Sequence, residues 1–174
     1  MTAQRFTDRL NVQIGNEFAA HQQYVACAIY YDALTMPRMA AFFYTQALEE
    51  RDHAMMMVKY LLDQGMQVEI PGVDAPVSKF GDLVEPMTLA LDQEKRVTEQ
   101  VNELTRIARD EGDLASEQFM HWFIKEQVEE VSTISDLLTV VTRAKDDIEA
   151  IEEYVARELS SDRSDPTAPA IAGT

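Results

Sequence analysis

The sequence predicts an all-α fold: a four-helix bundle with one long crossover connection and a short fifth helix. Three observations carry this prediction. Long segments repeat apolar residues at alternating spacings of three and four, which is the period of an amphipathic helix. Two connections between these segments are about three residues long and one is about eighteen, which fixes how neighbouring helices run. The 174 residues also suffice for one domain with a sizeable core.

The first two helices are predicted over residues 7–34 and 38–64, and each is followed by a residue that a helix interior excludes. Pro37 stops the first helix, because proline lacks a backbone donor and clashes with the preceding turn. Gly65 ends the second, since glycine readily takes the left-handed conformation that follows many helices. The link between them is about three residues long, so the two helices form an antiparallel hairpin.

The remaining helices are predicted over residues 84–112, 114–143 and 146–159. Pro86 lies in the first turn of the third helix, where proline is tolerated, and Gly112 ends that helix. The third and fourth helices form a second antiparallel hairpin. We assign residues 1–160 to one domain, and we expect residues 161–174 to form a flexible acidic tail because Ser, Asp, Pro, Ala and Gly dominate them.

The long connection over residues 66–83 contains Pro71, Gly72, Pro76 and Gly81 and has no helical period. A helix of about 27 residues is about 40 Å long, whereas about eighteen extended residues reach about 60 Å. The connection can therefore cross the whole bundle, which leaves the second and third helices parallel.

Composition excludes several classes of function. The net charge of −16 argues against a nucleic-acid partner, because phosphate binding depends on Lys and Arg. No apolar run approaches the roughly 20 residues of a membrane span, and the N-terminus lacks the apolar region of a signal peptide. Cys27 is the only cysteine, so no intrachain disulfide forms. We expect a cytoplasmic protein with Cys27 buried as a small apolar residue.

The apolar stripe of each long helix is interrupted near its middle by a glutamate: Glu17, Glu50, Glu94 and Glu130. The predicted connectivity places these four at one level of the bundle. Unpaired, each would cost several kcal/mol or take up a proton. Because the stripes contain no Lys or Arg, a bound metal cation is the simplest compensation. The excess negative charge elsewhere indicates either solvated helix faces or an acidic interior or pore that attracts cations.

The types of ligand narrow the choice of metal. His53 follows Glu50 by three residues and therefore lies on the same helix face. Four carboxylates and one imidazole, without a thiolate, suit iron or manganese better than structural zinc. A glutamate from each of two helices, Glu17 and Glu94, together with a Glu-x-x-His motif, makes up most of a di-iron carboxylate site.

Three segments resemble those of the ferritin family. Residues 44–53, YTQALEERDH, are similar to the second helix of ferritins, Asn16-Glu17-Phe18 with Tyr24 to the first, and residues 126–130, EQVEE, to the fourth. The resemblance covers about residues 6–159. It implies a ferritin-like four-helix bundle that oxidises Fe(II) with O2 or hydrogen peroxide. It also implies a homo-oligomeric shell of 24 subunits around a ferric mineral, as in iron storage and detoxification.

The same resemblance implies a role for each residue at the centre. Glu17, Glu50 and His53 would hold the first iron, and Glu50 would bridge to a second iron held by Glu94 and Glu130. Each subunit would thus bind two irons. The anionic ligands would favour Fe(III) over Fe(II) and so promote oxidation.

Further residues match positions around this pair. Gln127 matches a side chain at the second iron, as a ligand or as a hydrogen-bond partner of oxygen or water. Tyr24 matches a tyrosine that donates an electron or orients the ligands. Glu49, Glu126 and Glu129 stand where bacterial ferritins hold a third iron, although a solvated acidic face explains them equally well.

The sequence departs from close relatives of this family at two places. Bacterioferritins carry a second Glu-x-x-His on the fourth helix, where this chain has Gln127-x-x-Glu130. Their haem-ligating methionine falls between the Glu and His of the second helix, where this chain has Arg51 and Asp52. We therefore expect no haem.

Some features have more than one interpretation. The tail after residue 160 is either inert, which we favour, or docks onto an encapsulating shell. Glu117 could line a three-fold pore, whereas packing or surface exposure explains His21 and His121 better than metal binding. Two other functions remain open: a non-catalytic metal buffer or cage subunit, and a di-iron peroxidase or oxidase of small oligomeric size. A DNA-protecting mini-cage is less favoured, because it would lack the fifth helix.

Overall fold

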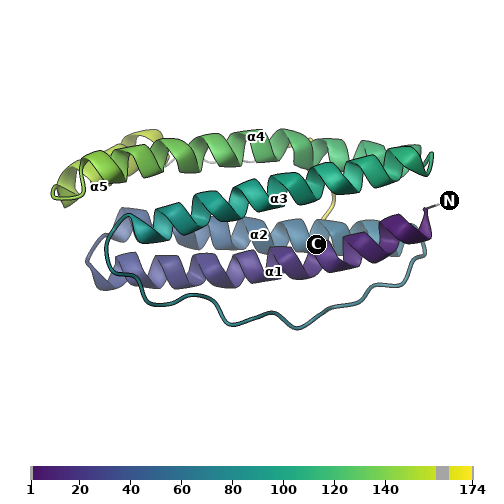
Figure 1. The fold of residues 1–174 in the computed structure, drawn as a ribbon, viewed down its shortest axis with the longest axis horizontal. Coiled ribbons are helices and arrows are strands. Elements are labelled where there is room, and N and C mark those ends of the chain that lie inside the picture. Colours follow the sequence, from purple (N-terminus) through teal and green to yellow (C-terminus); the bar gives the residue numbers. More distant parts are fainter. Residues whose placement is uncertain (1, 160–164, 174) are drawn as a thin grey trace.

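The computed structural model describes residues 2–159 and 165–173 and confirms the all-α bundle with a short fifth helix (Figure 1). The helices are α1 (Gln4–Ala33), α2 (Pro37–Asp63), α3 (Glu85–Asp110), α4 (Leu114–Arg143) and α5 (Ile148–Glu158). The hairpin of α1 and α2 packs beside the hairpin of α3 and α4, and α5 contacts α2 and α4. Within the described residues, none of the helices combines the length and apolar character that a membrane span requires.

The start of α1 differs most from the helix bounds predicted above. It lies at Gln4 rather than near Thr7. The amide of Ala3 donates a hydrogen bond to Asp113 Oδ2 at 3.1 Å, and the amide of Thr7 donates to the Ala3 carbonyl at 3.0 Å. A carboxylate from the turn between α3 and α4 therefore fixes the first turn of α1. The local sequence contains no sign of this partner.

The three long helices that enter turns end in the same way, with a residue in the left-handed conformation. Gly65 and Gly112 follow α2 and α3 with φ of 66° at each, and Thr35 follows α1 with φ of 60°. In each turn the next amide donates to the carbonyl five residues before it, as in Met36 to Tyr31 at 3.0 Å. After α1 and α3 this geometry reverses the chain within a few residues and produces the two antiparallel hairpins, whereas after α2 it leads into the crossover.

The crossover between α2 and α3 contains no helix or strand and runs along the whole length of α1 (Figure 1). Side chains of Asn11, Gln23 and Tyr31 bind its backbone with hydrogen bonds of 2.7–3.1 Å. At Gly15 the crossover approaches so closely that an added Cβ would lie 2.5 Å from Pro71 Cγ. The crossover is thus fixed along one helix face, and α2 and α3 run parallel.

The buried apolar side chains form two clusters with a polar layer between them. One cluster includes Phe6, Leu10, Leu61 and Leu104, and the other includes Tyr31, Phe43, Met87 and Leu137. The layer between them contains the buried polar side chains Glu17, Glu50, Glu94, Gln127 and Glu130. The glutamates predicted from the helix stripes therefore lie at one level of the bundle.

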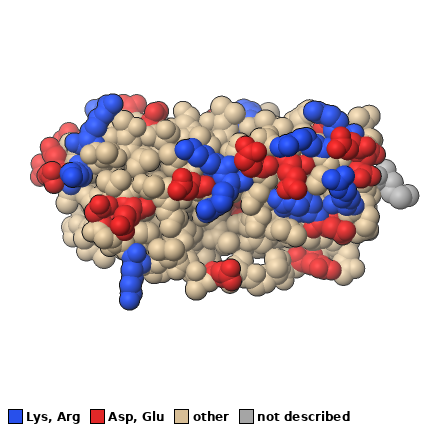
Figure 2. All heavy atoms as spheres, in the orientation of Figure 1, with Lys and Arg blue, Asp and Glu red and all other residues tan. Residues whose placement is uncertain are grey.

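Charged side chains are interspersed on the face drawn in Figure 2. Lys and Arg alternate with Asp and Glu over α1, α3 and the crossover, and no acidic patch dominates this face. Several of these charges are paired, as in Arg9 with Glu103 at 2.9 Å. The charge on this face therefore matches a solvated surface with mixed signs rather than an acidic patch.

The C-terminal segment lies against the bundle over the residues that the structure describes. Residues 165–173 lie against α2 and α4, whereas residues 160–164 and 174 fall outside the described residues. Asp165 Oδ2 accepts hydrogen bonds from Trp122 Nε1 at 3.1 Å and from Lys125 Nζ at 3.0 Å. The amide of Ala172 donates to the Met55 carbonyl at 3.2 Å. The packing of Ala168, Ile171 and Ala172 on the core and the hydrogen bonds of Asp165 account for the position of this segment.

Candidate metal centre

The centre of the polar layer contains Glu17 from α1 with Glu50 and His53 from α2. One potential ligand atom from each of these residues lies within 4.8 Å of the other two. All three are buried, with 1%, 1% and 4% of their surface exposed. His53 Nδ1 lies 3.6 Å from Glu50 Oε2. Because Glu50 and His53 are one helical turn apart, α2 presents both to the same point, and α1 supplies the third side chain.

Glu94 from α3 is held at both carboxylate oxygens. The Tyr24 hydroxyl donates a hydrogen bond to Glu94 Oε1, and Gln127 Nε2 donates to Oε2 at 3.3 Å. The carbonyl oxygen of Gln127 lies 3.0 Å from the Thr98 hydroxyl, and its amide nitrogen faces Glu94. Tyr24 and Gln127 thus lie beside Glu94 and both bind its carboxylate.

Glu130 from α4 completes the layer and is 2% exposed. Its charge contributes to raising the pKa of Glu50 and of Tyr24. Glu130 therefore faces the same interior as the other predicted ligands. Glu94 and Glu130 lie outside the tight group of Glu17, Glu50 and His53.

Burial of so many acids changes their protonation. Burial raises the pKa of Glu17 well above its ordinary value, and the charge of Glu50 raises it further. Burial and the charge of Glu94 do the same for the pKa of Glu50. Burial also raises the pKa of Glu94, although the hydrogen bond from Tyr24 opposes this shift. The layer therefore favours bound protons or a bound cation over four bare carboxylates.

The donor set fits a divalent cation of the iron type. Glu17 Oε2 and Glu50 Oε2 are buried, and no amide, hydroxyl or cationic donor of the described residues forms a hydrogen bond with either atom. The two carboxyl groups adjoin, so without a cation only a proton shared between them can bridge them. The buried polar residues of the described chain include no Lys or Arg that could neutralise them. Carboxylate oxygens with one imidazole suit Fe(II) or Mn(II), and a cation between Glu17, Glu50 and His53 would satisfy both oxygens.

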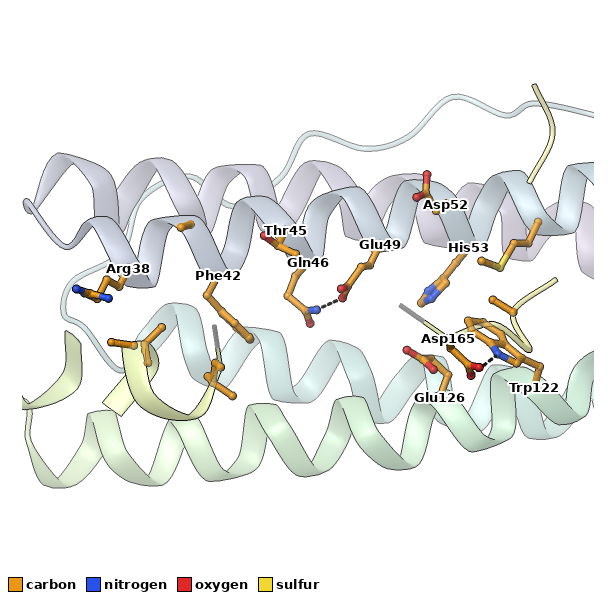
Figure 3. Close-up of a pocket in the computed structure, with 16 residues that line it drawn as sticks. Arg38, Phe42, Thr45, Gln46, Glu49, Asp52, His53, Trp122, Glu126 and Asp165 are labelled. Carbon is orange, nitrogen blue, oxygen red and sulfur yellow. Dashed lines mark hydrogen bonds between the residues drawn. The ribbon is translucent and has the colours of Figure 1, made fainter. Parts of the chain in front are cut away.

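A cavity of about 740 Å³ lies beside the centre, between α2, α4, α5 and the C-terminal segment (Figure 3). His53 and Trp122 both line it and pack edge to face against one another, with ring centroids 5.6 Å apart. Four acidic residues line the cavity: Glu49, Asp52, Glu126 and Asp165. His53 thus separates the buried layer from an acidic space near the surface.

The structure brings only two of the three residues of the predicted third iron site to one cavity. Glu49 and Glu126 line the cavity, whereas Glu129 is exposed and lines a neighbouring pocket that Glu126 also reaches. Burial raises the pKa of Glu126, and the charges of Glu129 and Asp165 add to this. Among the described residues, no second group of three ligands lies as close together as Glu17, Glu50 and His53. The third site stays a prediction.

The other singled-out residues take structural positions. His21 Nδ1 lies 2.6 Å from the Ala47 carbonyl and joins α1 to α2. Cys27 is buried, and burial raises the pKa of its thiol to about 12. His121 is half-exposed, and Glu117 accepts hydrogen bonds from Arg109 at 2.8 and 2.9 Å. None of these joins the polar layer.

Two buried glutamines that were not predicted from the sequence also contact residues at or near the centre. Gln13, one turn before Glu17, donates a hydrogen bond to Glu17 Oε1 at 2.7 Å. Gln46 is 2% exposed, lines the cavity and donates to Glu49. The signal for Gln13 was its spacing of four from Glu17, which places both on one helix face.

Known proteins with similar sequences and structures match nearly the whole chain. A family model described as a ferritin-like domain matches residues 7–144. The chain is 50% identical over 169 residues to "Ferritin BfrB" of Mycolicibacterium smegmatis, covering 97% of this chain and 93% of that protein. It is 36% identical over 154 residues to "Bacterial non-heme ferritin" of Staphylococcus aureus, covering 88% of this chain and 93% of that protein.

The fold is also similar to solved structures. An open pore ferritin from the hyperthermophilic archaeon Archaeoglobus fulgidus superimposes with a TM-score of 0.86 at 26% sequence identity. The match covers 90% of this chain and 96% of the archaeal chain.

Proposed function

This chain belongs to the ferritin family of iron-storage proteins, and from that membership we propose that each subunit oxidises Fe(II) to Fe(III) at the buried carboxylate centre. One observation carries the proposal. Glu17 and Glu50 each keep one buried oxygen that no amide, hydroxyl or cationic donor of the described residues reaches, and both lie beside His53. Ionised carboxylates in this arrangement are costly unless they take up protons or bind a cation.

Fe(II) is the substrate of this centre rather than a resident cofactor. Glu17, Glu50 and His53 bind the first iron, and Glu94 and Glu130 bind the second, with Glu50 shared between them. Two adjacent ions allow O2 or peroxide to accept two electrons without release of a one-electron radical. The anionic ligands stabilise Fe(III) over Fe(II), which favours oxidation.

Residues around the centre also determine how protons are released when iron binds and how iron passes between the centre and the surface. Fe(II) displaces the protons that the buried acids hold, because their pKa values are raised without a cation. Tyr24 and Gln127 fix Glu94, so this ligand needs little rearrangement when iron binds. His53, Glu49 and Glu126 line the same cavity, and this cavity serves as the route by which iron leaves the metal centre. A third iron at Glu49, Glu126 and Glu129 would lie on this route.

Storage requires an assembly, and we propose a shell of 24 subunits around a ferric mineral. The full-length match to ferritins supports this proposal. We expect no haem, because exposed Arg51 and half-buried Asp52 bind one another where a haem-ligating methionine would stand.

Oxygen uptake on addition of Fe(II) tests the oxidation step. The paired variant Glu50→Ala/His53→Ala should slow the fast phase by more than about tenfold, because two of the three closest ligands are removed. The matched control Glu99→Ala/His121→Ala removes the same residue types from the exposed surface and should leave the phase unchanged.

Two outcomes would contradict the proposal. A fast phase that persists in the Glu50→Ala/His53→Ala variant would place the oxidation elsewhere. Fe(II) binding by the native chain without oxygen uptake would identify a non-catalytic metal-binding bundle instead.

A further inference from the structure

A row of polar side chains leads from the surface to Glu17 and lies outside the set of metal ligands. Gln13 is 0% exposed and stands at the centre of this row. Its amide nitrogen donates to Glu17 Oε1 at 2.7 Å and to Gln100 Oε1 at 3.0 Å. Its carbonyl oxygen accepts from Arg9 at 3.2 Å and from Asn16 at 3.1 Å. Both donors and both acceptor positions of the Gln13 amide are therefore used.

Arg9 fixes which way the Gln13 amide faces. A guanidinium only donates hydrogen bonds, so the atom of Gln13 that faces it is the carbonyl oxygen. Glu103 accepts a hydrogen bond from Arg9 at 2.9 Å and holds the guanidinium in place. If the amide of Gln13 turned over, its NH2 group would face Arg9 and its oxygen would face Glu17. The contact with Arg9 would then place donors against donors, and the contact with an ionised Glu17 would be repulsive as well, so Arg9 favours the amide nitrogen pointing at Glu17.

The contact decides which oxygen of Glu17 is available. Gln13 occupies Oε1, whereas Oε2 is buried and no amide, hydroxyl or cationic donor of the described residues reaches it. Resting on the function proposed above, we propose that Gln13 is a positioning residue that holds Glu17 by one oxygen and directs the other oxygen to the incoming divalent cation. Glu17 then binds iron as a terminal, one-oxygen ligand.

The chemistry of an amide suits this role better than that of a cationic side chain. A Lys or Arg in contact with Glu17 would also fix it, but its charge would repel Fe(II) and compete for the carboxylate. Gln13 places a neutral donor next to Glu17 and keeps the charge of Arg9 one side chain further away. The hydrogen bond from Arg9 also polarises the Gln13 amide and strengthens its donation to Glu17.

Binding of Co(II) to the full-length assembled protein tests this role without any oxidation step. Gln13→Met keeps the length of the side chain and removes its polar atoms. We expect the tightest class of Co(II) sites to weaken by about tenfold, as is typical when a partner of a metal ligand is lost. The visible absorption bands of bound Co(II) should change as well, because Glu17 can then rotate and bind through both oxygens.

Two further variants separate positioning from packing. Gln23→Met removes a buried glutamine of the same helix that binds the crossover backbone at Val77, and it should leave Co(II) affinity and spectrum unchanged. Arg9→Met removes the hydrogen bond from Arg9 to the Gln13 carbonyl oxygen but keeps the Gln13 amide. It should therefore weaken Co(II) binding by less than Gln13→Met does. If Gln13→Met fails to fold, Arg9→Met alone decides, and native Co(II) affinity and spectrum in that variant would overturn the role.

The proposal is overturned if Gln13→Met binds Co(II) with native affinity and spectrum. It is also overturned if Gln13→Met and Gln23→Met weaken binding equally, because the effect would then come from packing of α1. Failure of the oxidation proposal is distinguishable, since it is measured as missing oxygen uptake by the native chain. Native Co(II) binding and its response to the variants do not depend on that result.

Discussion

Gly15 shows how one missing side chain shapes the molecule. It lies inside α1, where alanine would be preferred by about 1 kcal/mol on helix propensity. Yet a Cβ here would lie 2.5 Å from Pro71 Cγ, and neither the ring nor the fixed crossover can yield easily. Gly15→Ala should therefore destabilise the protein by about 1 kcal/mol, because overpacking outweighs the propensity gain. The thermal unfolding midpoint of the metal-free protein measures this.

The steric origin of that loss can be isolated in a double-mutant cycle. In a Pro71→Ala background the ring is absent, so Gly15→Ala should become stabilising. A loss of stability that persists in that background would show that the close approach of Pro71 is not its cause.

The buried acids make the stability of the metal-free protein depend on pH. The folded-state pKa of Glu17 is raised above its ordinary 4.5, so its contribution to stability is present below 4.5 and is lost as pH rises through the raised value. Glutamine is neutral throughout. The metal-free Glu17→Gln variant should therefore gain thermal stability over the native chain as pH rises from about 5 to about 8.

Exposed Glu99 gives the control for this prediction. The difference in thermal stability between Glu99→Gln and the native chain should not grow with pH, because the Glu99 side chain is 77% exposed. A stability difference between Glu17→Gln and the native chain that stays constant with pH would contradict the assignment of a raised pKa to Glu17.

At the scale of an element, the turn after α1 uses a residue that is not suited to its conformation. Thr35 has φ of 60°, where a side chain with a branched Cβ is strained, and Thr35 itself is exposed. Thr35→Gly should raise stability by about 0.5 kcal/mol, since relief of strain exceeds the entropy cost of glycine. Chemical denaturation measures the change. Thr45→Gly, at an exposed position within α2, should instead lower stability by about 1 kcal/mol.

The carboxylate of Asp165 anchors the start of the described C-terminal segment on α4. Asp165 binds Trp122, Lys125 and Thr167, and these hydrogen bonds hold the pKa of its carboxyl well below the usual range. Asp165→Ala should release residues 165–173 from α4 and shift the fluorescence of Trp122, the only tryptophan, toward longer wavelength. The exposed Asp146→Ala should leave the emission unchanged. Equal emission from both variants would show that Asp165 does not hold the segment.

Helical periodicity explains what the sequence could predict. Glu17, Glu50, Glu94 and Glu130 interrupt apolar stripes, so their burial followed from spacing, and their common level followed from spacing together with the lengths of the connections. The Asp113 contact to Ala3 and the seating of Asp165 join residues far apart in sequence and leave no local pattern. Gln13 was predictable only in part. Its spacing from Glu17 placed both residues on one helix face, but its burial depended on how α3 packs on α1.

At the scale of the whole molecule, the proposed shell fixes a particle mass. Twenty-four chains of 19.7 kDa give about 470 kDa, and light scattering on the eluted protein should report this mass. Iron-loaded particles should keep that outer size and gain density, because the mineral forms inside. A species of two to four subunits would contradict storage and would favour a small di-iron enzyme.

The polar layer also divides unequally between the two hairpins. The first hairpin, α1 with α2, carries the close group of Glu17, Glu50 and His53, whereas the second contributes Glu94 and Glu130. Each hairpin can form from local contacts, but the layer closes only when the two dock and the crossover lies along α1. Iron bound by ligands from both hairpins, as proposed above, would stabilise the docked bundle over its separated hairpins.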